Sequence, residues 1–136
     1  MKILFICKYN RFRSRVAEAY FKKRNKNKNI KATSAGLVKG FLPLDNNQVK
    51  IAKRFGVNIL GKPKTFSMDM LKEQDKIIVI VDDIPKTIFN YKWYKDKVTF
   101  WKIKDVLEGT DNKGNERIIK SIFKKVDALI KKLEKK

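Results

Sequence analysis

Short apolar segments alternate with amphipathic ones along the chain, and this alternation constrains the fold more than any other feature. Strands that are apolar at consecutive positions are typical of parallel sheets covered on both faces, and parallel strands need a crossover that is usually a helix. The predicted strands are residues 3–7, 30–34, 76–81 and 97–103. The sequence therefore predicts a three-layer α/β domain, in which helices cover both faces of a four-stranded parallel sheet.

The segments between and after these strands carry helix signals. Asp45 and Ser67 stand where N-cap residues are expected, and Gly56 stands just past the end of a predicted helix. The predicted helices are residues 13–23, 45–55, 67–71, 85–94 and 116–133, with residues 109–115 as a loop. We expect a single domain over residues 1–136 with the strand order 2-1-3-4 of flavodoxin-like sheets.

The run from Cys7, the chain's one cysteine, to Ser14 lies between the first strand and the first helix. The unpaired N–H groups and the dipole of a helix N-terminus favour an anion there, and favour a thiolate at Cys7. Arg13 adds a planar guanidinium that matches two oxygens of a phosphate or arsenate. Although a lone cysteine after a buried strand is often only an apolar core residue, this pattern is typical of cysteine-dependent phosphoryl transfer.

Cleavage of a phosphate ester also needs a group that protonates the departing oxygen, and the chain contains no histidine. Aspartates that follow later strands would reach the same edge of the sheet as Cys7. Asp82 and Asp83 follow the third predicted strand, and Asp105 follows the fourth. Their spacing does not choose among them, and each is also explained as a loop or capping residue.

The composition is strongly basic, with 34 Lys and Arg against 14 Asp and Glu and a formal net charge of +20. Such a surface attracts polyanions, but we interpret the dense runs at residues 21–29 and 130–136 as solvated faces.

A single cysteine excludes an internal disulfide, and the aliphatic run at residues 77–81 is too short to span a bilayer. We expect a cytoplasmic protein without a membrane partner, a metal or a cofactor.

Residues 3–21, ILFICKYNRFRSRVAEAYF, resemble the N-terminus of the low-molecular-weight protein tyrosine phosphatases, whose fold is shared by thioredoxin-linked arsenate reductases. The shared features are the apolar strand, the Cys-x5-Arg-Ser pattern and a helix containing Ala-Glu-Ala. Residues 33–36, 43–45, 55–57 and 101–105 resemble later segments of that family. The resemblance implies a phosphoric monoester hydrolase of the protein-tyrosine-phosphatase type that acts through a phosphocysteine.

Position by position, the resemblance implies Cys7 as the nucleophile and Arg13 as the clamp for phosphate and the transition state. Ser14 would donate a hydrogen bond to the Cys7 thiolate. Asp105 would act first as the general acid and then as the base that activates water.

The resemblance further implies that Asn10 holds the phosphate-binding loop in its shape, with help from Ser34. The substrate would be a phosphorylated protein or a small phosphomonoester, and oxyanions such as phosphate would bind the same loop. The predicted substrate-binding residues are Lys8, Tyr9, Asn10, Arg11, Phe12 and Ser14.

The chain departs from the family pattern at three places. Tyr9 stands where a small residue is usual, and Phe12 stands where a second cysteine is often present. Residues 106–108, Val-Leu-Glu, follow Asp105 where Pro and then aromatic residues are common.

Three other functions fit parts of the sequence. Arsenate reduction would use the same anion cradle, but a single cysteine leaves only a route that borrows an external thiol. A phosphocarrier must keep its phosphocysteine intact, which an arginine clamp and an acid–base aspartate oppose. A nucleic-acid-binding module would use the basic surface alone, yet no RNA-binding motif is evident, so nucleic acid is not the favoured partner.

Overall fold

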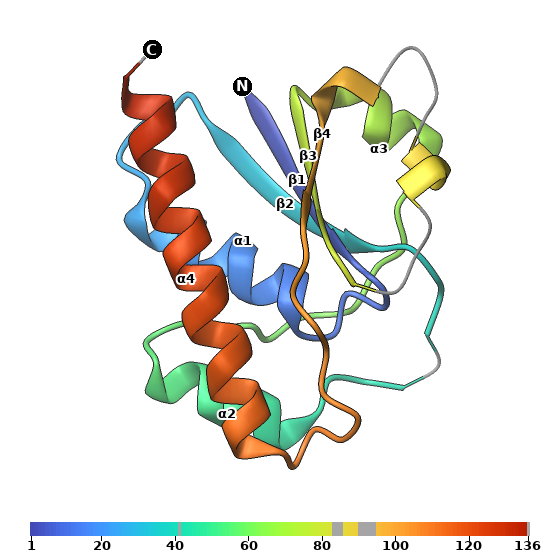
Figure 1. The fold of residues 1–136 in the computed structure, drawn as a ribbon, viewed down its shortest axis with the longest axis vertical. Coiled ribbons are helices and arrows are strands. Elements are labelled where there is room, and N and C mark those ends of the chain that lie inside the picture. The colour runs from blue at the N-terminus through green and yellow to red at the C-terminus, as the bar shows by residue number, and fades with distance from the viewer. Residues whose placement is uncertain (41, 83–85, 90–94, 136) are drawn as a thin grey trace.

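The structure is a computed structural model that describes residues 1–40, 42–82, 86–89 and 95–135. Its centre is one sheet of four parallel strands in the order β2-β1-β3-β4 (Figure 1). The strands are β1 (Lys2–Cys7), β2 (Lys31–Gly36), β3 (Lys76–Ile80) and β4 (Val98–Trp101). The predicted fold class and strand order are confirmed.

The helices of the described part follow the predicted alternation. They are α1 (Arg13–Arg24), α2 (Asn46–Arg54), α3 (Met68–Glu73) and α4 (Asn112–Glu134), with two short 3-10 helices, η1 (Lys86–Phe89) and η2 (Lys95–Lys97). The helix predicted over residues 85–94 lies largely outside the described residues, and its described part, residues 86–89, is the 3-10 helix η1.

The two faces of the sheet bury separate apolar clusters because alternate residues of each strand point to opposite sides. On one face, Phe5 of β1 packs against Phe21 of α1 and Trp101 of β4, with ring centroids 6.0 and 5.9 Å apart. Helices α1, α2 and α4 cover this face (Figure 1). On the other face, Leu4 and its neighbours pack against Leu71 of α3. The central strands are therefore apolar at consecutive positions.

Side-chain caps begin three of the helices. Asp45 accepts a hydrogen bond from the Gln48 backbone N–H at the start of α2, and Ser67 caps α3 in the same way through Met70. The helix α4 begins at Asn112, inside the predicted loop, because Asp111 accepts from the Gly114 backbone N–H. The expected start at residue 116 was therefore too late.

The last strand ends earlier than predicted. The sequence predicts a strand to residue 103, but β4 ends at Trp101. The Ile103 N–H turns back to the Trp101 carbonyl oxygen, and the Ile103 carbonyl oxygen accepts from Arg13. Because these backbone groups are already hydrogen-bonded, residues 102–105 leave the sheet and lie beside Arg13 at the start of α1.

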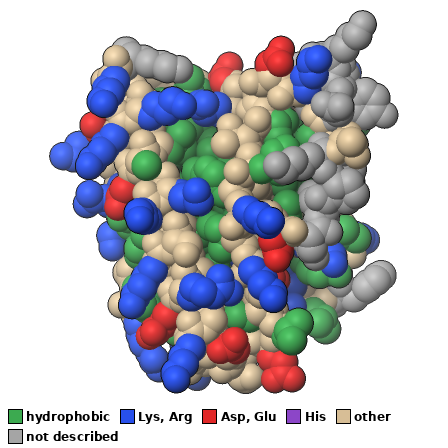
Figure 2. All heavy atoms as spheres, in the orientation of Figure 1, with side chains coloured by type: hydrophobic (Ala, Val, Ile, Leu, Met, Phe, Trp, Pro, Cys, Tyr) green, Lys and Arg blue, Asp and Glu red, His purple; other side chains and the backbone are tan. Residues whose placement is uncertain are grey.

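Basic side chains are spread over the face of the molecule that Figure 2 shows. On the face seen in Figure 2, Lys and Arg side chains lie over several elements with Asp and Glu among them, and they do not gather into one stripe. This distribution agrees with the interpretation of the basic runs as solvated faces. No helix in the described residues is both long and apolar enough to cross a membrane.

The Asp111 cap gives a test of how α4 is held. We expect Asp111→Ala to lower the free energy of unfolding by about 0.5–2 kcal/mol, because the Gly114 N–H loses its acceptor. Asp111→Asn keeps a side-chain oxygen at this position and should stay close to the parent protein. Urea unfolding of the three proteins measures the difference, and an equal loss in both variants would show that the cap is not the cause.

Candidate active site

The predicted phosphate-binding run, Cys7 to Ser14, begins at the carboxyl end of β1, and its residues 8–12 form a loop between β1 and α1. Cys7 is the last residue of β1 and pairs with Gly36, the last residue of β2. The loop backbone packs so closely on Gly36 that a Cβ there would lie 2.8 Å from the Tyr9 carbonyl carbon and 2.9 Å from the Asn10 nitrogen. Only glycine therefore fits at position 36 without moving the loop.

Helix α1 begins directly after this loop without a side-chain cap. Its N-cap residue is Phe12, which makes no capping hydrogen bond, and its first turn contains no acidic residue. The N-terminal N–H groups and the positive end of the helix dipole are thus available to an anion held by the loop. This arrangement has the form of the anion cradle that the sequence predicts, and anion binding itself stays a prediction.

The sulfur of Cys7 is buried beside two polar residues of the loop and helix. Cys7 Sγ lies 3.0 Å from Ser14 Oγ, and the cysteine is 3% exposed. Asn10 Nδ2 donates to Ser14 Oγ at 2.8 Å and to Ser34 Oγ at 3.0 Å. Asn10 is fully buried with a φ of 55°, a left-handed conformation that Asn tolerates better than most residues. The predicted cluster of Cys7, Ser14, Asn10 and Ser34 is therefore present.

Arg13 reaches from the first turn of α1 to the ends of β3 and β4. Its side chain is buried, and Nη1 donates to the Ile103 carbonyl oxygen at 2.9 Å. Arg13 Nη2 lies 3.5 Å from Asp105 Oδ2, and Nη1 lies 4.0 Å from Asp82 Oδ1. The guanidinium thus lies between two of the three aspartates that the sequence singled out, while Asp83 lies outside the described residues.

A small cavity of about 80 Å³ opens at this point. Pockets that enclose drug-sized molecules have volumes of roughly 300–1,000 Å³, so this cavity suits a group as small as a tetrahedral oxyanion. Asp105 lines it, whereas Asp82 is not among its described lining residues. The residues that line it are Cys7, Tyr9, Arg11, Phe12, Arg13, Asp45, Gln48, Asp105, Val106, Leu107 and Gly109.

Not every predicted substrate-binding residue reaches this cavity. Tyr9, Arg11 and Phe12 line it, and Arg11 Nε also donates to the Pro43 carbonyl oxygen. The ammonium of Lys8 lies over the Tyr9 ring, 5.5 Å from its centroid. Asn10 and Ser14 are fully buried and are not among the described residues that line the cavity, so their contact with substrate stays a prediction.

The sequence did not indicate two polar residues of the cavity. Asp45 was identified only as a helix cap and Gln48 not at all, yet both line the cavity. They reach it because the start of α2 packs against the start of α4, where Gln48 donates to Asn115 Oδ1. This contact joins distant segments, and local sequence patterns carry no signal for it.

Solved structures share this architecture. A protein tyrosine phosphatase from Entamoeba histolytica is 26% identical, with a TM-score of 0.83 over 100% of this chain and 97% of that one. An arsenate reductase from Archaeoglobus fulgidus is 25% identical, with a TM-score of 0.72 over 94% and 98%. The arginine phosphatase YwlE from Geobacillus stearothermophilus, at 18% identity and a TM-score of 0.83 over 98% and 93%, shares the fold.

No curated protein sequence matches the chain. The family model of the low molecular weight phosphotyrosine protein phosphatases, however, matches residues 2–136. The match includes the anion cradle at the end of β1 and the segment that carries Asp105. The chain therefore belongs to the low molecular weight phosphotyrosine protein phosphatase family, with Cys7 in the phosphate-binding loop.

Proposed function

We propose that this phosphatase removes phosphate from tyrosine in proteins through a phosphocysteine on Cys7. The observation that supports this most is the meeting of Cys7, Arg13 and Asp105 around one small cavity. A nucleophile, a bidentate clamp and an acid–base group are the parts that a two-step phosphoryl transfer needs.

In the first step, the Cys7 thiolate attacks phosphorus and an S–P bond forms while the bond from phosphorus to the ester oxygen breaks. Protonated Asp105 gives its proton to the departing oxygen, so that the leaving group departs as a neutral alcohol or phenol. The guanidinium of Arg13 and the N–H groups of the α1 N-terminus stabilise the negative charge on the phosphoryl oxygens.

In the second step, the Asp105 carboxylate takes a proton from water as the water oxygen attacks phosphorus. The S–P bond breaks, inorganic phosphate leaves, and sulfur returns to the thiolate. A hydrogen bond from the Ser14 hydroxyl, 3.0 Å away, stabilises the negative sulfur as it leaves. Asp105 ends the cycle protonated, ready for the next turnover.

Asp105 is a better candidate for the acid than Asp82. Its carboxylate lies at the cavity, is 45% exposed and is therefore in contact with water. Asp82 is 22% exposed and approaches the opposite nitrogen of Arg13 at 4.0 Å. We assign to Asp82 the role of holding the guanidinium in place.

The mouth of the cavity favours an aryl phosphate on a protein. Tyr9 and Leu107 line it and are exposed, so an aromatic ring that carries the phosphate could pack between apolar surfaces. The formal charge of +20 would attract an acidic phosphoprotein. The thiolate nucleophile must stay reduced, and for this reason we also propose a cytoplasmic location.

A second candidate substrate is phosphoarginine. Two carboxylates, Asp45 and Asp105, line the cavity, and carboxylates are the usual partners of a guanidinium. Parallel assays with a phosphotyrosine peptide, a phosphoarginine peptide, and arsenate with an external thiol separate these substrates. Turnover of arsenate alone would overturn the phosphatase proposal.

The nucleophile can be tested with two variants. We expect Cys7→Ser to abolish hydrolysis of para-nitrophenyl phosphate while the circular dichroism spectrum stays unchanged. Arg13→Lys should also lose most activity, because an ammonium cannot bind two phosphoryl oxygens as a guanidinium does. Activity that persists in purified Cys7→Ser protein would overturn the covalent mechanism.

The acid can be tested by varying the leaving group. Asp105→Asn should slow hydrolysis of a phosphotyrosine peptide by about 10²–10⁴-fold, the usual contribution of proton transfer. Hydrolysis of para-nitrophenyl phosphate should fall much less, since nitrophenolate leaves without a proton. Asp82→Asn is the matched variant, and if it alone shows this leaving-group dependence, the acid is Asp82.

A further inference from the structure

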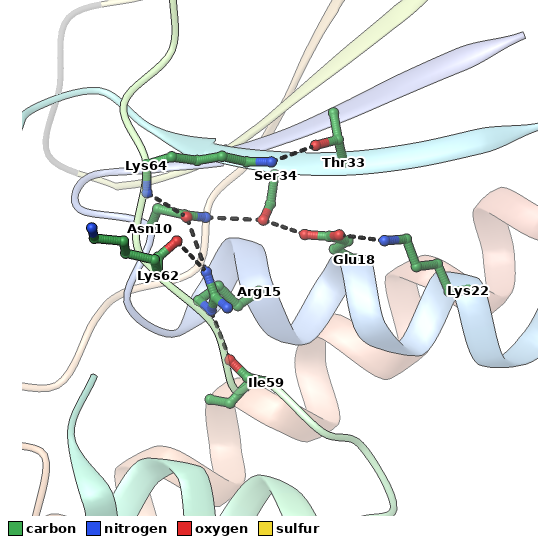
Figure 3. A network of polar contacts seen from close by, with 9 residues as sticks. All are labelled: Asn10, Arg15, Glu18, Lys22, Thr33, Ser34, Ile59, Lys62 and Lys64. Carbon is green, nitrogen blue, oxygen red and sulfur yellow. Dashed lines mark hydrogen bonds and ion pairs between the residues drawn. The ribbon is translucent and has the colours of Figure 1, made fainter. Parts of the chain in front are cut away.

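Arg15 lies beside the phosphate-binding loop but does not line its cavity. It follows Ser14 in the first turn of α1, and its side chain extends under the loop toward the segment that precedes α3 (Figure 3). Arg15 Nε donates to the Ile59 carbonyl oxygen at 2.8 Å, and Nη1 lies within 3.3 Å of the Lys62 carbonyl oxygen. Nη1 also donates to Asn10 Oδ1 at 3.2 Å.

The chain leaves room for this guanidinium at Gly61. A Cβ on Gly61 would lie 2.3 Å from Arg15 Nη2, and the φ of Gly61 is +144°, which side-chain-bearing residues rarely adopt. Any other residue at position 61 would therefore push the guanidinium aside. The fit of Arg15 to this segment depends on glycine at that position.

The Arg15 contact fixes the direction of the Asn10 amide. Asn10 Oδ1 accepts from Arg15 and from the Lys64 backbone N–H at 3.1 Å. Both hydrogens of Nδ2 are used by Ser14 and Ser34. Turning the amide over would place its NH₂ group against a cation and a backbone donor, so only one orientation satisfies all four partners.

With this orientation, the hydroxyl groups of Ser14 and Ser34 both accept from Asn10 and can donate to a further partner. Ser14 Oγ accepts from Asn10 and lies 3.0 Å from Cys7 Sγ. When Cys7 is a thiolate it can only accept, so the Ser14 O–H is then the donor of this contact. Ser34 Oγ likewise accepts from Asn10 and donates to the carboxylate of Glu18. A continuous path of hydrogen bonds therefore leads from Arg15 through Asn10 and Ser14 to the sulfur of Cys7.

The positive charge of Arg15 also favours a thiolate at Cys7, as the hydrogen bonds do. Burial lowers the pKa of the Arg15 guanidinium, while the negative charges of Glu18 and of the Cys7 thiolate oppose this shift. Arg15 remains a cation at neutral pH, as arginine does in proteins. The attraction is mutual, so the partly buried cation favours negative charge in the loop.

We propose that Arg15 is a positioning residue for catalysis, which holds the Asn10 amide so that the Ser14 hydroxyl donates to the Cys7 thiolate. This inference deepens the proposed function and rests on it in one respect, that Cys7 is the reacting atom. Arg15 itself does not touch the substrate.

The proposal can be tested by replacing Arg15 with Gln and with Lys. Arg15→Gln should lower kcat for para-nitrophenyl phosphate by about tenfold to a hundredfold, the scale expected for a misplaced reacting group. It should also slow alkylation of Cys7 by iodoacetamide at pH 7, because less of the sulfur is thiolate. Inhibition by phosphate should change little, since Arg13 and the helix N-terminus still bind it. Arg15→Lys should recover part of kcat.

Arg24→Gln is the matched control, because it removes a guanidinium from the exposed end of the same helix. It should leave kcat, alkylation and inhibition at parent values. Gly61→Ala keeps the charge of Arg15 but displaces its guanidinium, and it should lower kcat as Arg15→Gln does. Melting temperatures of all variants report any loss of folded protein.

A purely structural role for Arg15 predicts a different result. The melting temperature of Arg15→Gln would fall while kcat and the alkylation rate of the folded protein stayed at parent values, and this would overturn the proposal.

A double variant gives a second test. Asn10→Gly removes the amide and tolerates the positive φ. In that background Arg15→Gln should cause no further loss of kcat, and a full additional loss of kcat would also overturn the proposal. A parent protein without phosphatase activity would refute the proposed function, yet the alkylation comparison would still test Arg15.

Discussion

The amide of Asn10 holds the site together. It is buried in a left-handed backbone conformation, and its oxygen and nitrogen hydrogen-bond four partners on three parts of the chain: Ser14 and Arg15 of α1, Ser34 of β2, and Lys64 in the segment before α3. A buried amide without partners would cost several kcal/mol, so the loop can take this shape only when all of these segments have come together. The anion cradle therefore forms as the fold forms.

A second constraint comes from the buried guanidinium of Arg13. A charge that is 3% exposed must be neutralised and hydrogen-bonded, and the Ile103 carbonyl and two carboxylates meet this need. The same contacts end β4 and bring Asp105 to the cavity. One electrostatic requirement thus places both the clamp and the candidate acid. Phosphate entering the cavity would offer the guanidinium further oxygens in the same place.

The two arginines in the first turn of α1, Arg13 and Arg15, point in different directions. Arg13 faces the cavity, where it can bind substrate, and Arg15 faces the opposite side, where it contacts the support of the loop. Arg13 and Arg15 are two residues apart on α1, and residues at that spacing point to different sides of a helix. Of these two basic residues, Arg13 is therefore placed to bind substrate and Arg15 to support the loop.

The fold could be predicted from local patterns, and so could the closeness of the candidate site residues on either side of the loop. Consecutive apolar residues in the strands require a covered parallel sheet, and Cys7, Arg13 and Ser14 lie within one short run whose place after β1 determines their setting. The family resemblance further indicated Asp105 and the support by Asn10 and Ser34. Caps such as Asp45 and Ser67 were predictable because a cap bonds to its own helix.

Only the tertiary structure decided which groups meet across the chain. The sequence left Asp82, Asp83 and Asp105 equivalent by position, and the course of residues 102–105 over α1 brought Asp105 to the cavity. Arg15 could not be distinguished from the other basic residues, since its partners are backbone carbonyls of residues 59 and 62, which carry no sequence signature. Local patterns determine elements and their ends, whereas contacts between distant backbone groups depend on how those elements pack.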